Sequence, residues 1–215
     1  MKDLKAIRGA TLLREWVAEG EHVHQDFKFT ISDARKIARS VSAFANNDGG
    51  RLLIGVKDNG VIAGVRNEED IYVVEQAAER YCIPPQTPEF RAYRLEDNIR
   101  VIVAEISPAS RRPVYVSEDS GLKKAYFRVA DENIAAHPLM VRSWELNEST
   151  APALTQRHYE LAALYSGGMA MNERQAALEL HISVSEAEDI IVRLASAGLI
   201  TFIFDGTRFI PKGIE

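Results

Sequence analysis

Residues 41–65 read VSAFANNDGGRLLIGVKDNGVIAGV, and this stretch decides the fold of the first part of the chain. Its apolar residues first recur at helical spacing, and the Asn and Gly residues of 46–50 favour a turn, so a helix is predicted to end there. The apolar run at 52–56 predicts a buried strand. The sequence of 57–60 ends in Asn-Gly, which readily adopts the positive φ angles of a hairpin turn, and 61–65 is therefore predicted as the returning strand.

The residues before this stretch predict a further helix and a further strand. Apolar side chains between residues 12 and 17 lie at helical spacing and the pattern ends at Gly20, which indicates a short amphipathic helix. Residues 22–30 alternate between polar and apolar side chains, which is the pattern of a half-buried strand. His22 and His24 share one face of this strand. Because no third ligand is evident, they are interpreted as surface histidines rather than as a zinc site.

After the hairpin, one helix and several strands complete the first domain. Residues 68–81 show helical periodicity that ends at Cys82-Ile83-Pro84-Pro85, where the prolines forbid continuation, and Cys82 is expected to fill a core position. The polar segment 108–122 is predicted as an exposed excursion. The predicted fold class is α+β, with a mostly antiparallel sheet and packed helices. The further strands are predicted at 89–95, 99–106 and 125–129.

The last third of the chain has a different pattern, which predicts a second domain. Three helical segments are followed by two short strands around an Asp-Gly turn, which is the arrangement of a winged helix-turn-helix. The polar residues 146–153 include Pro152 and are interpreted as a linker, so the domains are predicted at 1–147 and 148–215. The helices are predicted at 154–165, 173–180 and 184–197, and the strands at 199–204 and 208–210.

Composition limits the classes of protein to which the chain can belong. Its 215 residues carry 26 Lys and Arg against 31 Asp and Glu, a formal charge of −5, which excludes a general polycation. With 46% hydrophobic residues the chain can build a sizeable core. A single cysteine, no signal-peptide pattern and no apolar run of membrane length indicate a cytoplasmic protein without a membrane partner. The chain lacks a G-x4-G-K-[ST] phosphate loop, so nucleotide hydrolysis is not supported.

The negative charge is concentrated in the second predicted domain. The first domain carries 21 basic and 22 acidic side chains, whereas the second carries 5 and 9. The helix at 184–197 would be the one that enters the major groove, yet phosphate groups would repel the acids of its first turns, Glu186, Glu188 and Asp189. This pattern argues against strong DNA binding by the second domain and favours dimerisation or the binding of a partner protein.

Three motifs in the first domain occur in a fixed order. They are Glu21-x4-Asp26-Phe27-Lys28, then Ser42-Ala43-Phe44-Ala45-Asn46-x2-Gly49-Gly50, then Leu53-Ile54-Gly55-Val56-x-Asp58. In this order they resemble the Schlafen-type AlbA-like domain. The later segment 126–129 is similar to the late strand of such domains, so the resemblance covers about residues 14 to 145. Bacterial members often carry a C-terminal winged helix and are described as DNA-binding proteins or transcriptional regulators, which the resemblance implies here too.

The resemblance also implies a set of candidate catalytic residues. In Schlafen proteins that cut RNA, the matching positions form a divalent-metal nuclease site, and here they are Glu21, Asp26 and Asp58. Such carboxylates could hold Mg²⁺ or Mn²⁺ and activate water. Asp26 replaces the glutamate of the family and is one methylene shorter. Five positions separate it from Glu21, so only a bend near residues 20–23 would bring the two together. The alternative is that all three acids are ordinary turn or surface residues.

Other matched positions are candidates for nucleic-acid contacts. The resemblance implies a phosphate contact for Lys28, and Arg51 and Arg128 are candidates beside it; the alternative is that all three are ordinary solvent-facing charges. A structural turn, whose backbone N–H groups can also form an anion nest, is predicted at Asn46, Gly49 and Gly50.

Together these patterns favour a nucleic-acid-binding protein, with DNA favoured over RNA as the partner. The expected role is that of a transcriptional regulator whose AlbA-like domain contacts the phosphate backbone and whose winged helix aids dimerisation or positioning. A homodimer is expected, and no cofactor. One alternative is an enzyme, a metal-dependent endoribonuclease that would require Mg²⁺ or Mn²⁺. The other alternative is a protein-interaction module without a nucleic-acid role.

Overall fold

The computed structural model describes residues 4, 7–65, 69–95, 98–146 and 151–214. The chain divides into two compact units, Met1–Ala135 and Ala136–Glu215. The boundary predicted between residues 147 and 148 lies outside the described residues. The units divide earlier because α4 (Pro138–Glu145), which the sequence did not predict, packs Leu139 into the core of the second unit. Among the described helices, none combines the length and apolarity that a bilayer span requires.

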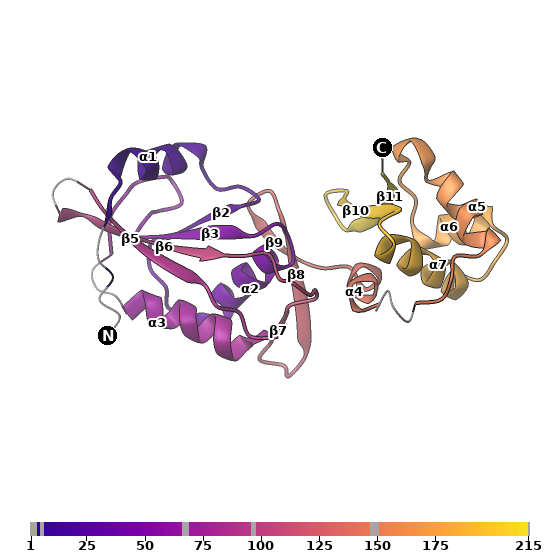
Figure 1. Ribbon diagram of the computed structural model, residues 1–215, viewed down its shortest axis with the longest axis horizontal. Coiled ribbons are helices and arrows are strands. Elements are labelled where there is room, and N and C mark those ends of the chain that lie inside the picture. Colours follow the sequence, from indigo (N-terminus) through magenta and orange to yellow (C-terminus); the bar gives the residue numbers. More distant parts are fainter. Residues whose placement is uncertain (1–3, 5–6, 66–68, 96–97, 147–150, 215) are drawn as a thin grey trace. The chain divides into compact units, whose positions relative to one another are not determined.

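A five-stranded sheet forms the centre of the first unit (Figure 1). Its strand order is β1-β5-β6-β3-β2; the two outer strands run parallel to their neighbours, and the inner pairs are antiparallel. The strands predicted at 89–95 and 99–106 are confirmed as its β5 and β6. The bounds are β1 (Ile7–Arg8), β2 (Gln25–Lys28), β3 (Gly50–Ile54), β5 (Glu89–Arg94) and β6 (Arg100–Ile106).

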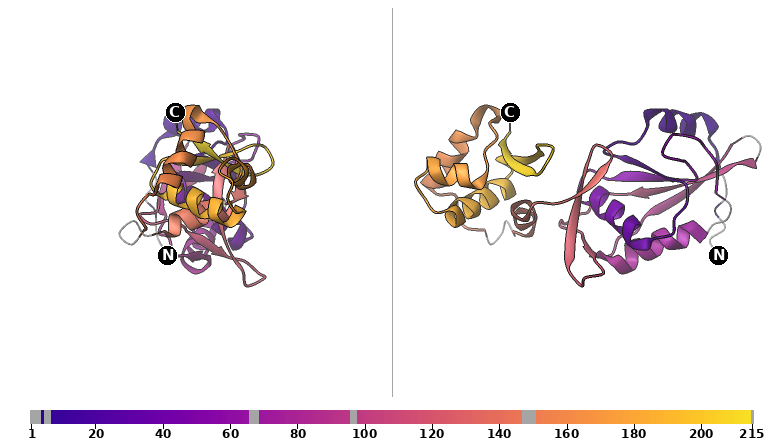
Figure 2. Two further views of the ribbon diagram at one scale, coloured as in Figure 1. Left: turned by 90° about the vertical axis from the view of Figure 1, so that its right-hand side faces the viewer. Right: turned by 180° about the vertical axis from the view of Figure 1, so that it is seen from behind.

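Helices cover both faces of this sheet, as Figures 1 and 2 show. On β3, Leu53 contributes to the core beside α1 (Ala10–Glu19), whereas Leu52 and Ile54 contribute to the core beside α2 (Ala34–Ala45) and α3 (Glu69–Gln76). The strand is therefore buried on both sides, which explains its uninterrupted apolar sequence. The helix predicted at 68–81 is confirmed over its described residues, because α3 continues through one wider turn, Ala77–Tyr81.

A second, four-stranded antiparallel sheet packs against the other side of α2, so that this helix lies between the two sheets. The prediction that 108–122 is an exposed excursion is wrong in part, because Val114 and Val116 are fully buried under α2. Cys82 is 1% exposed, which confirms its predicted core position. The strand bounds are β4 (Cys82–Ile83), β7 (Tyr115–Ser117), β8 (Lys123–Val129) and β9 (Glu132–Ala135).

Two strands predicted from the sequence, at 61–65 and at 22–30, are shorter in the structure. The segment 61–65 forms only one bridge, between Ile62 and Val56 just after β3, because the chain bends at Gly55 and Gly64, which have φ angles of +99° and +78°. A Cβ on Gly55 would lie 2.8 Å from the backbone of Gly64, so the close approach requires glycine. The strand predicted at 22–30 is confirmed only as Gln25–Lys28, and the residues before it form a turn.

The second unit contains the helices and strands that the sequence predicts for its last part. Helices α5, α6 and α7 surround a core that includes Leu161, Ala176 and Ile191, and β10 and β11 form an antiparallel hairpin. The bounds are α5 (Gln156–Leu164), a short 3-10 turn (Ser166–Gly168), α6 (Glu173–Glu179), α7 (Val184–Ser196), β10 (Ile200–Phe204) and β11 (Phe209–Gly213).

Candidate functional site

A tight turn places the two acids of the first motif side by side. His22 and Gln25 each donate a backbone N–H to the carbonyl of the other, at 3.0 and 3.1 Å. This reverses the chain, so Glu21 lies beside β2 and its Oε1 accepts the backbone N–H of Phe27 at 2.8 Å. The bend that the sequence required for Glu21 and Asp26 to meet is therefore present, as a turn before the strand.

Asp26 is the centre of a buried polar cluster. Its side chain is held in the interior, with the residue only 3% exposed. Oδ1 accepts a hydrogen bond from Nζ of Lys28 at 2.8 Å and lies 3.4 Å from Nη2 of Arg128. Oδ2 accepts a hydrogen bond from the Ser40 hydroxyl at 3.1 Å. These partners offset the cost of burying a carboxylate.

The two carboxyl groups have pKa values shifted in opposite directions. Burial, together with the hydrogen bond to Asp26, raises the pKa of Glu21 from 4.5 to about 7. Burial alone would raise the pKa of Asp26, but the hydrogen bond from Glu21 and the charge of Lys28 outweigh it and lower that pKa. The pair therefore retains one proton up to neutral pH, with Glu21 as the donor and Asp26 as the acceptor.

Arg128 lies in the interior of the first unit, which does not agree with the phosphate contact predicted for it. It is 2% exposed, and its guanidinium donates to the carbonyls of His22 and Gln25 at 3.3 and 3.1 Å. It also donates to Oδ1 of Asn133 at 3.0 Å. A cation that is buried and has a protein partner at each of its three nitrogens is not placed to contact phosphate in solvent, and here it connects β8 to the turn before β2.

Lys28 and Arg51 lie at the edge of the cluster and already have acidic partners. The Lys28 side chain is 29% exposed and is paired with Asp26. Arg51 stacks over the Trp16 ring at 4.3 Å and donates to Oε2 of Glu19 at 2.7 Å. Burial lowers the pKa of Arg51. Both cations are thus positioned by the protein, and Lys28 is the more exposed of the two.

Asp58 does not join the other two acids in a metal site. It lies on the exposed turn after β3. Within the described ranges, no group of three or more His, Cys, Asp and Glu side chains is placed to hold a metal ion. The structure brings Glu21 and Asp26 together, and the predicted three-carboxylate site for Mg²⁺ or Mn²⁺ does not fit this arrangement.

The turn predicted around Asn46 is confirmed and is structural. Asn46 is fully buried; its Nδ2 donates to the carbonyls of Val114 and Tyr126, each at 2.9 Å, and its Oδ1 accepts the N–H of Val114 at 2.7 Å. The N–H groups of Asn46 and Gly49 donate to carbonyls in the last turn of α2. They are therefore not available to bind an anion. A Cβ on Gly50 would lie 2.3 Å from an aromatic ring of α2.

Three residues of the cluster were not predicted. Ser40 bonds Asp26 and accepts from Asn133 at 3.0 Å, and Gln25 donates to two carbonyls near the end of α1. A signal for Ser40 was available, because it interrupts the apolar stripe of α2 at a buried position. Asn133 carries no such signal, since it reaches the cluster only through the pairing of β8 with β9.

The acids of α7 in the second unit are paired within that unit. Nη2 of Arg142 on α4 lies 2.5 Å from Asp189, and its Nη1 lies 3.6 Å from Glu188. Arg157 on α5 pairs with Glu186. The negative charge that was predicted to repel phosphate is therefore partly neutralised, by Arg142 of α4 and Arg157 of α5.

Comparisons with known proteins identify the family. Among solved structures, the DIP2311 protein from Corynebacterium diphtheriae aligns at 19% identity and a TM-score of 0.43, covering 67% of this chain and 34% of that one. The N-terminal domain of a RecG-related protein from Nitrosomonas europaea aligns at 17% identity and a TM-score of 0.42, covering 71% and 97%. The curated proteins give no significant match. A model of the family described as Schlafen, AlbA_2 matches residues 21–137, more than half of the chain, and the protein therefore belongs to this family.

Proposed function

We propose that the protein is a nucleic-acid-binding protein, with DNA as the favoured partner, and that it acts as a regulator of transcription. The observation that carries the proposal is the family match, which spans the buried cluster from Glu21 to Asn133. The cluster connects β2, α2, β8 and β9. It holds in place a surface at which nucleic acid can bind, and of the cations at its edge Lys28 is more exposed to solvent than Arg51.

The second unit is assigned a role in assembly. Helices α5, α6 and α7 followed by the hairpin of β10 and β11 support a winged helix, but two features do not favour base reading by α7. Val192, in the middle of α7, is 6% exposed, and Arg142 of α4 is bonded to the acids beside it. Readout in the major groove requires a helix face that is free and carries donors. Dimerisation or positioning of the first unit is the better supported role, and a homodimer is the proposed assembly.

The test is a fluorescence anisotropy titration at low salt with three labelled probes: duplex DNA, single-stranded DNA and structured RNA. Binding that weakens steeply as salt rises is expected for at least one probe, because phosphate contacts release counterions. Preference for a DNA probe supports the DNA assignment. Failure to bind any of the three probes would reject the proposal and favour the protein-interaction module.

A second candidate function is RNA cleavage, which one observation favours. Glu21 has a pKa of about 7 and lies beside an ionised Asp26, so it could exchange a proton with a substrate at neutral pH. The test is incubation of transfer RNA with Mn²⁺ or Mg²⁺, comparing the wild type with Glu21→Gln and Asp58→Ala. Cleavage that Glu21→Gln abolishes supports this candidate. Equal cleavage by all three proteins indicates a contaminating nuclease.

A further inference from the structure

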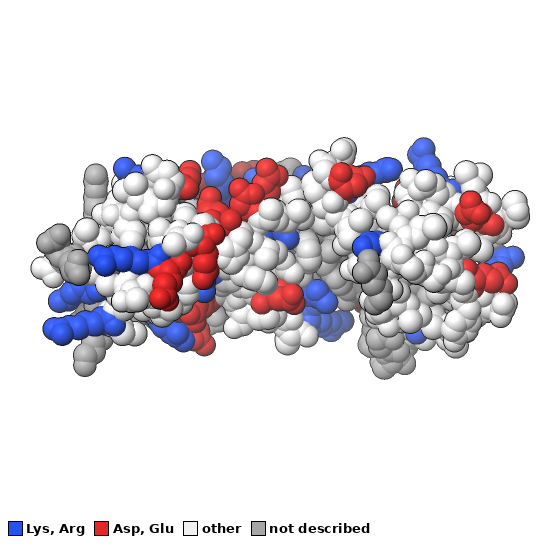
Figure 3. Space-filling view, turned by 90° about the horizontal axis from the view of Figure 1, so that it is seen from above, with Lys and Arg blue, Asp and Glu red and all other residues white. Residues whose placement is uncertain are grey.

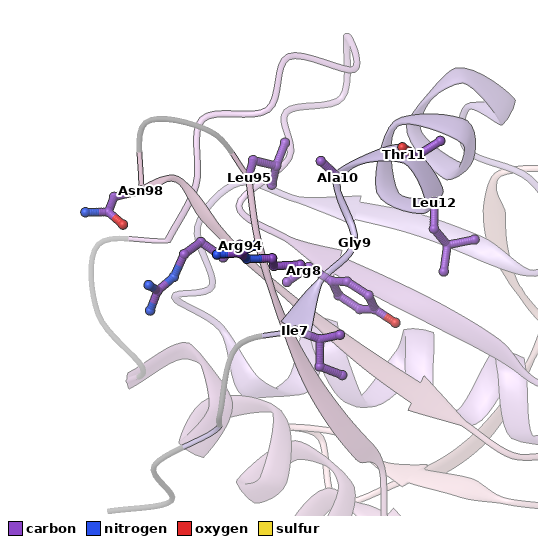
Figure 4. A pocket seen from close by; sticks show the side chains of 10 residues that line it. Ile7, Arg8, Gly9, Ala10, Thr11, Leu12, Arg94, Leu95 and Asn98 are labelled. Atoms are coloured by element: carbon purple, nitrogen blue, oxygen red, sulfur yellow. The ribbon is translucent and has the colours of Figure 1, made fainter.

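A cavity of about 850 Å³ opens at the edge of the five-stranded sheet. Its lining comes from β1, the first turn of α1 and the end of β5, as Figure 4 shows, and it shares no lining residue with the cluster around Asp26. Arg8, Arg94 and Asn98 supply polar groups, and the apolar side chains of Ile7 and Leu12 are 49% and 41% exposed. The volume and the mixed lining are those of a ligand site.

Three arginines on neighbouring strands lie directly opposite one another. Arg8 on β1 is in register with Arg94 on β5, and Arg94 is in register with Arg100 on β6. Residues in register point to the same face of a sheet, and strands lie about 4.8 Å apart. Like charges placed directly opposite one another destabilise a sheet, so an anion bound between Arg8 and Arg94 would relieve the repulsion between these two side chains.

The two arginines of the cavity also differ from the cations of the buried cluster. Within the described part of the chain, neither Arg8 nor Arg94 forms an ion pair with an acid, and both are exposed, whereas Lys28 and Arg51 are paired. Arg100 lies behind them, half-buried, with Nη2 3.4 Å from the carbonyl of Leu4. Figure 3 shows Lys and Arg side chains at the left-hand end of this unit, where Figure 1 places the end of β5.

The chemistry of the lining selects phosphoryl groups among anions. A guanidinium binds phosphate through paired N–H donors and remains charged at any physiological pH. The backbone of α1 adds further donors, since Gly9 has no side chain to cap its first turn, and Ala10 and Thr11 line the cavity. The exposed Ile7 and Leu12 give an apolar surface beside these donors, against which a base or a sugar can pack.

We propose that Arg8 and Arg94 form a phosphate-binding site at this cavity that holds the backbone of the nucleic acid. The proposal rests on the proposed function for the source of the phosphate, and it locates that contact at the sheet edge rather than at Arg128. Free nucleotides offer the same phosphoryl chemistry, so the experiment includes both sources.

The test compares the wild type with Arg8→Gln/Arg94→Gln. The matched control is Lys36→Gln/Arg80→Gln, which removes two exposed cations that belong to α2 and to the end of α3. Binding of a labelled single-stranded oligonucleotide is measured by anisotropy over a range of salt concentrations. We expect affinity to fall at least tenfold in the arginine variant and less than threefold in the control. The slope of log affinity against log salt should decrease by about 1.4 for two lost contacts.

A second measurement separates the site from the proposed function. Pyrophosphate and ATP are titrated into isotope-labelled wild type, and the amide resonances of Gly9 and Thr11 are followed by NMR. If these resonances shift in the wild type and not in the arginine variant, the site binds phosphate whether or not the oligonucleotide binds. ATP binding as tight as that of the oligonucleotide would identify a free nucleotide as the source. An arginine variant that binds the oligonucleotide like the wild type, or unmoved resonances with either anion, would overturn the proposal.

Discussion

The guanidinium of Arg128 lies 3.4 Å from the carboxylate of Asp26, and the two residues belong to different sheets. Asp26 is part of β2 in the five-stranded sheet, and Arg128 is part of β8 in the four-stranded sheet. Both are nearly completely buried. This ion pair connects the five-stranded sheet to the four-stranded sheet. Its removal should therefore lower the stability of the first unit rather than its affinity for a ligand.

Arg128→Met should lower the free energy of unfolding of the first unit by about 3 kcal/mol or more, because Asp26 would lose a buried cationic partner and the carbonyls of His22 and Gln25 would lose their guanidinium donor. Urea denaturation followed by tryptophan fluorescence measures this. Asp26→Asn/Arg128→Met should be less destabilised than the sum of the single variants, since the two residues are coupled. Unchanged stability in Arg128→Met, together with lost oligonucleotide binding, would restore the predicted phosphate contact.

The raised pKa of Glu21 predicts a pH dependence of stability. In the unfolded chain this carboxyl loses its proton near pH 4.5, whereas in the folded protein it does so near 7. Between these values only the folded state holds the proton, so the free energy of unfolding should fall as pH rises from about 4.5 to 7. Because Glu21 is partly exposed, screening reduces the effect to about 1 kcal/mol. The denaturation midpoint should change less with pH in Glu21→Gln than in the wild type. An identical change in the two proteins would contradict the raised pKa of Glu21.

Asn46→Ala should destabilise the first unit by about 2 to 4 kcal/mol, because the buried N–H of Val114 and the carbonyl of Tyr126 would lose the hydrogen bonds that Asn46 makes to them. Asn47→Ala is the matched control, since the Asn47 side chain donates a long hydrogen bond of 3.4 Å to the carbonyl of Arg128. Thermal unfolding compares the two. If Asn46→Ala kept its stability and lost phosphate binding, the anion nest would be the correct interpretation.

The pairing of the acids on α7 leads to a prediction for the second unit. Glu188→Gln/Asp189→Asn should change the affinity for duplex DNA by no more than about twofold, and stability by less than about 1 kcal/mol, because the pairs with Arg142 are exposed. If α7 instead lay in the major groove, removal of two negative charges should raise the affinity tenfold or more. Anisotropy with a duplex probe distinguishes these results.

Local patterns predicted most of the long elements, and the misses have physical causes. The helices α1, α2 and α3 and the strands β3, β5 and β6 follow from periodicity, because each packs a continuous apolar surface. The short strands β1, β4 and β9 contain few residues, so their pairing depends on partners far along the chain. The segment 108–122 reads as polar, yet its buried Val114 is hydrogen-bonded to Asn46, a long-range contact that no local pattern contains.

The sequence predicted which residues belong to the candidate site better than it predicted what each residue does there. The resemblance to the family motifs identified Glu21, Asp26 and Lys28, and the structure brings these three together. Charge alone suggested that Arg128 faces solvent, but burial depends on the second sheet, which sequence reasoning did not assemble. Arg8 and Arg94 were not singled out, because their register across β1 and β5 exists only after folding.

The turn between His22 and Gln25 makes the length of the first motif a geometric constraint. Side chains in a strand alternate between its faces, so one residue inserted between Glu21 and β2 would have to be absorbed entirely by the turn. If the strand took it up instead, Asp26 would exchange places with a neighbour that belongs in the apolar core. Loop-length variants at this turn thus offer a way to separate the two carboxyl groups while every side chain in the cluster is kept, which no point substitution can do.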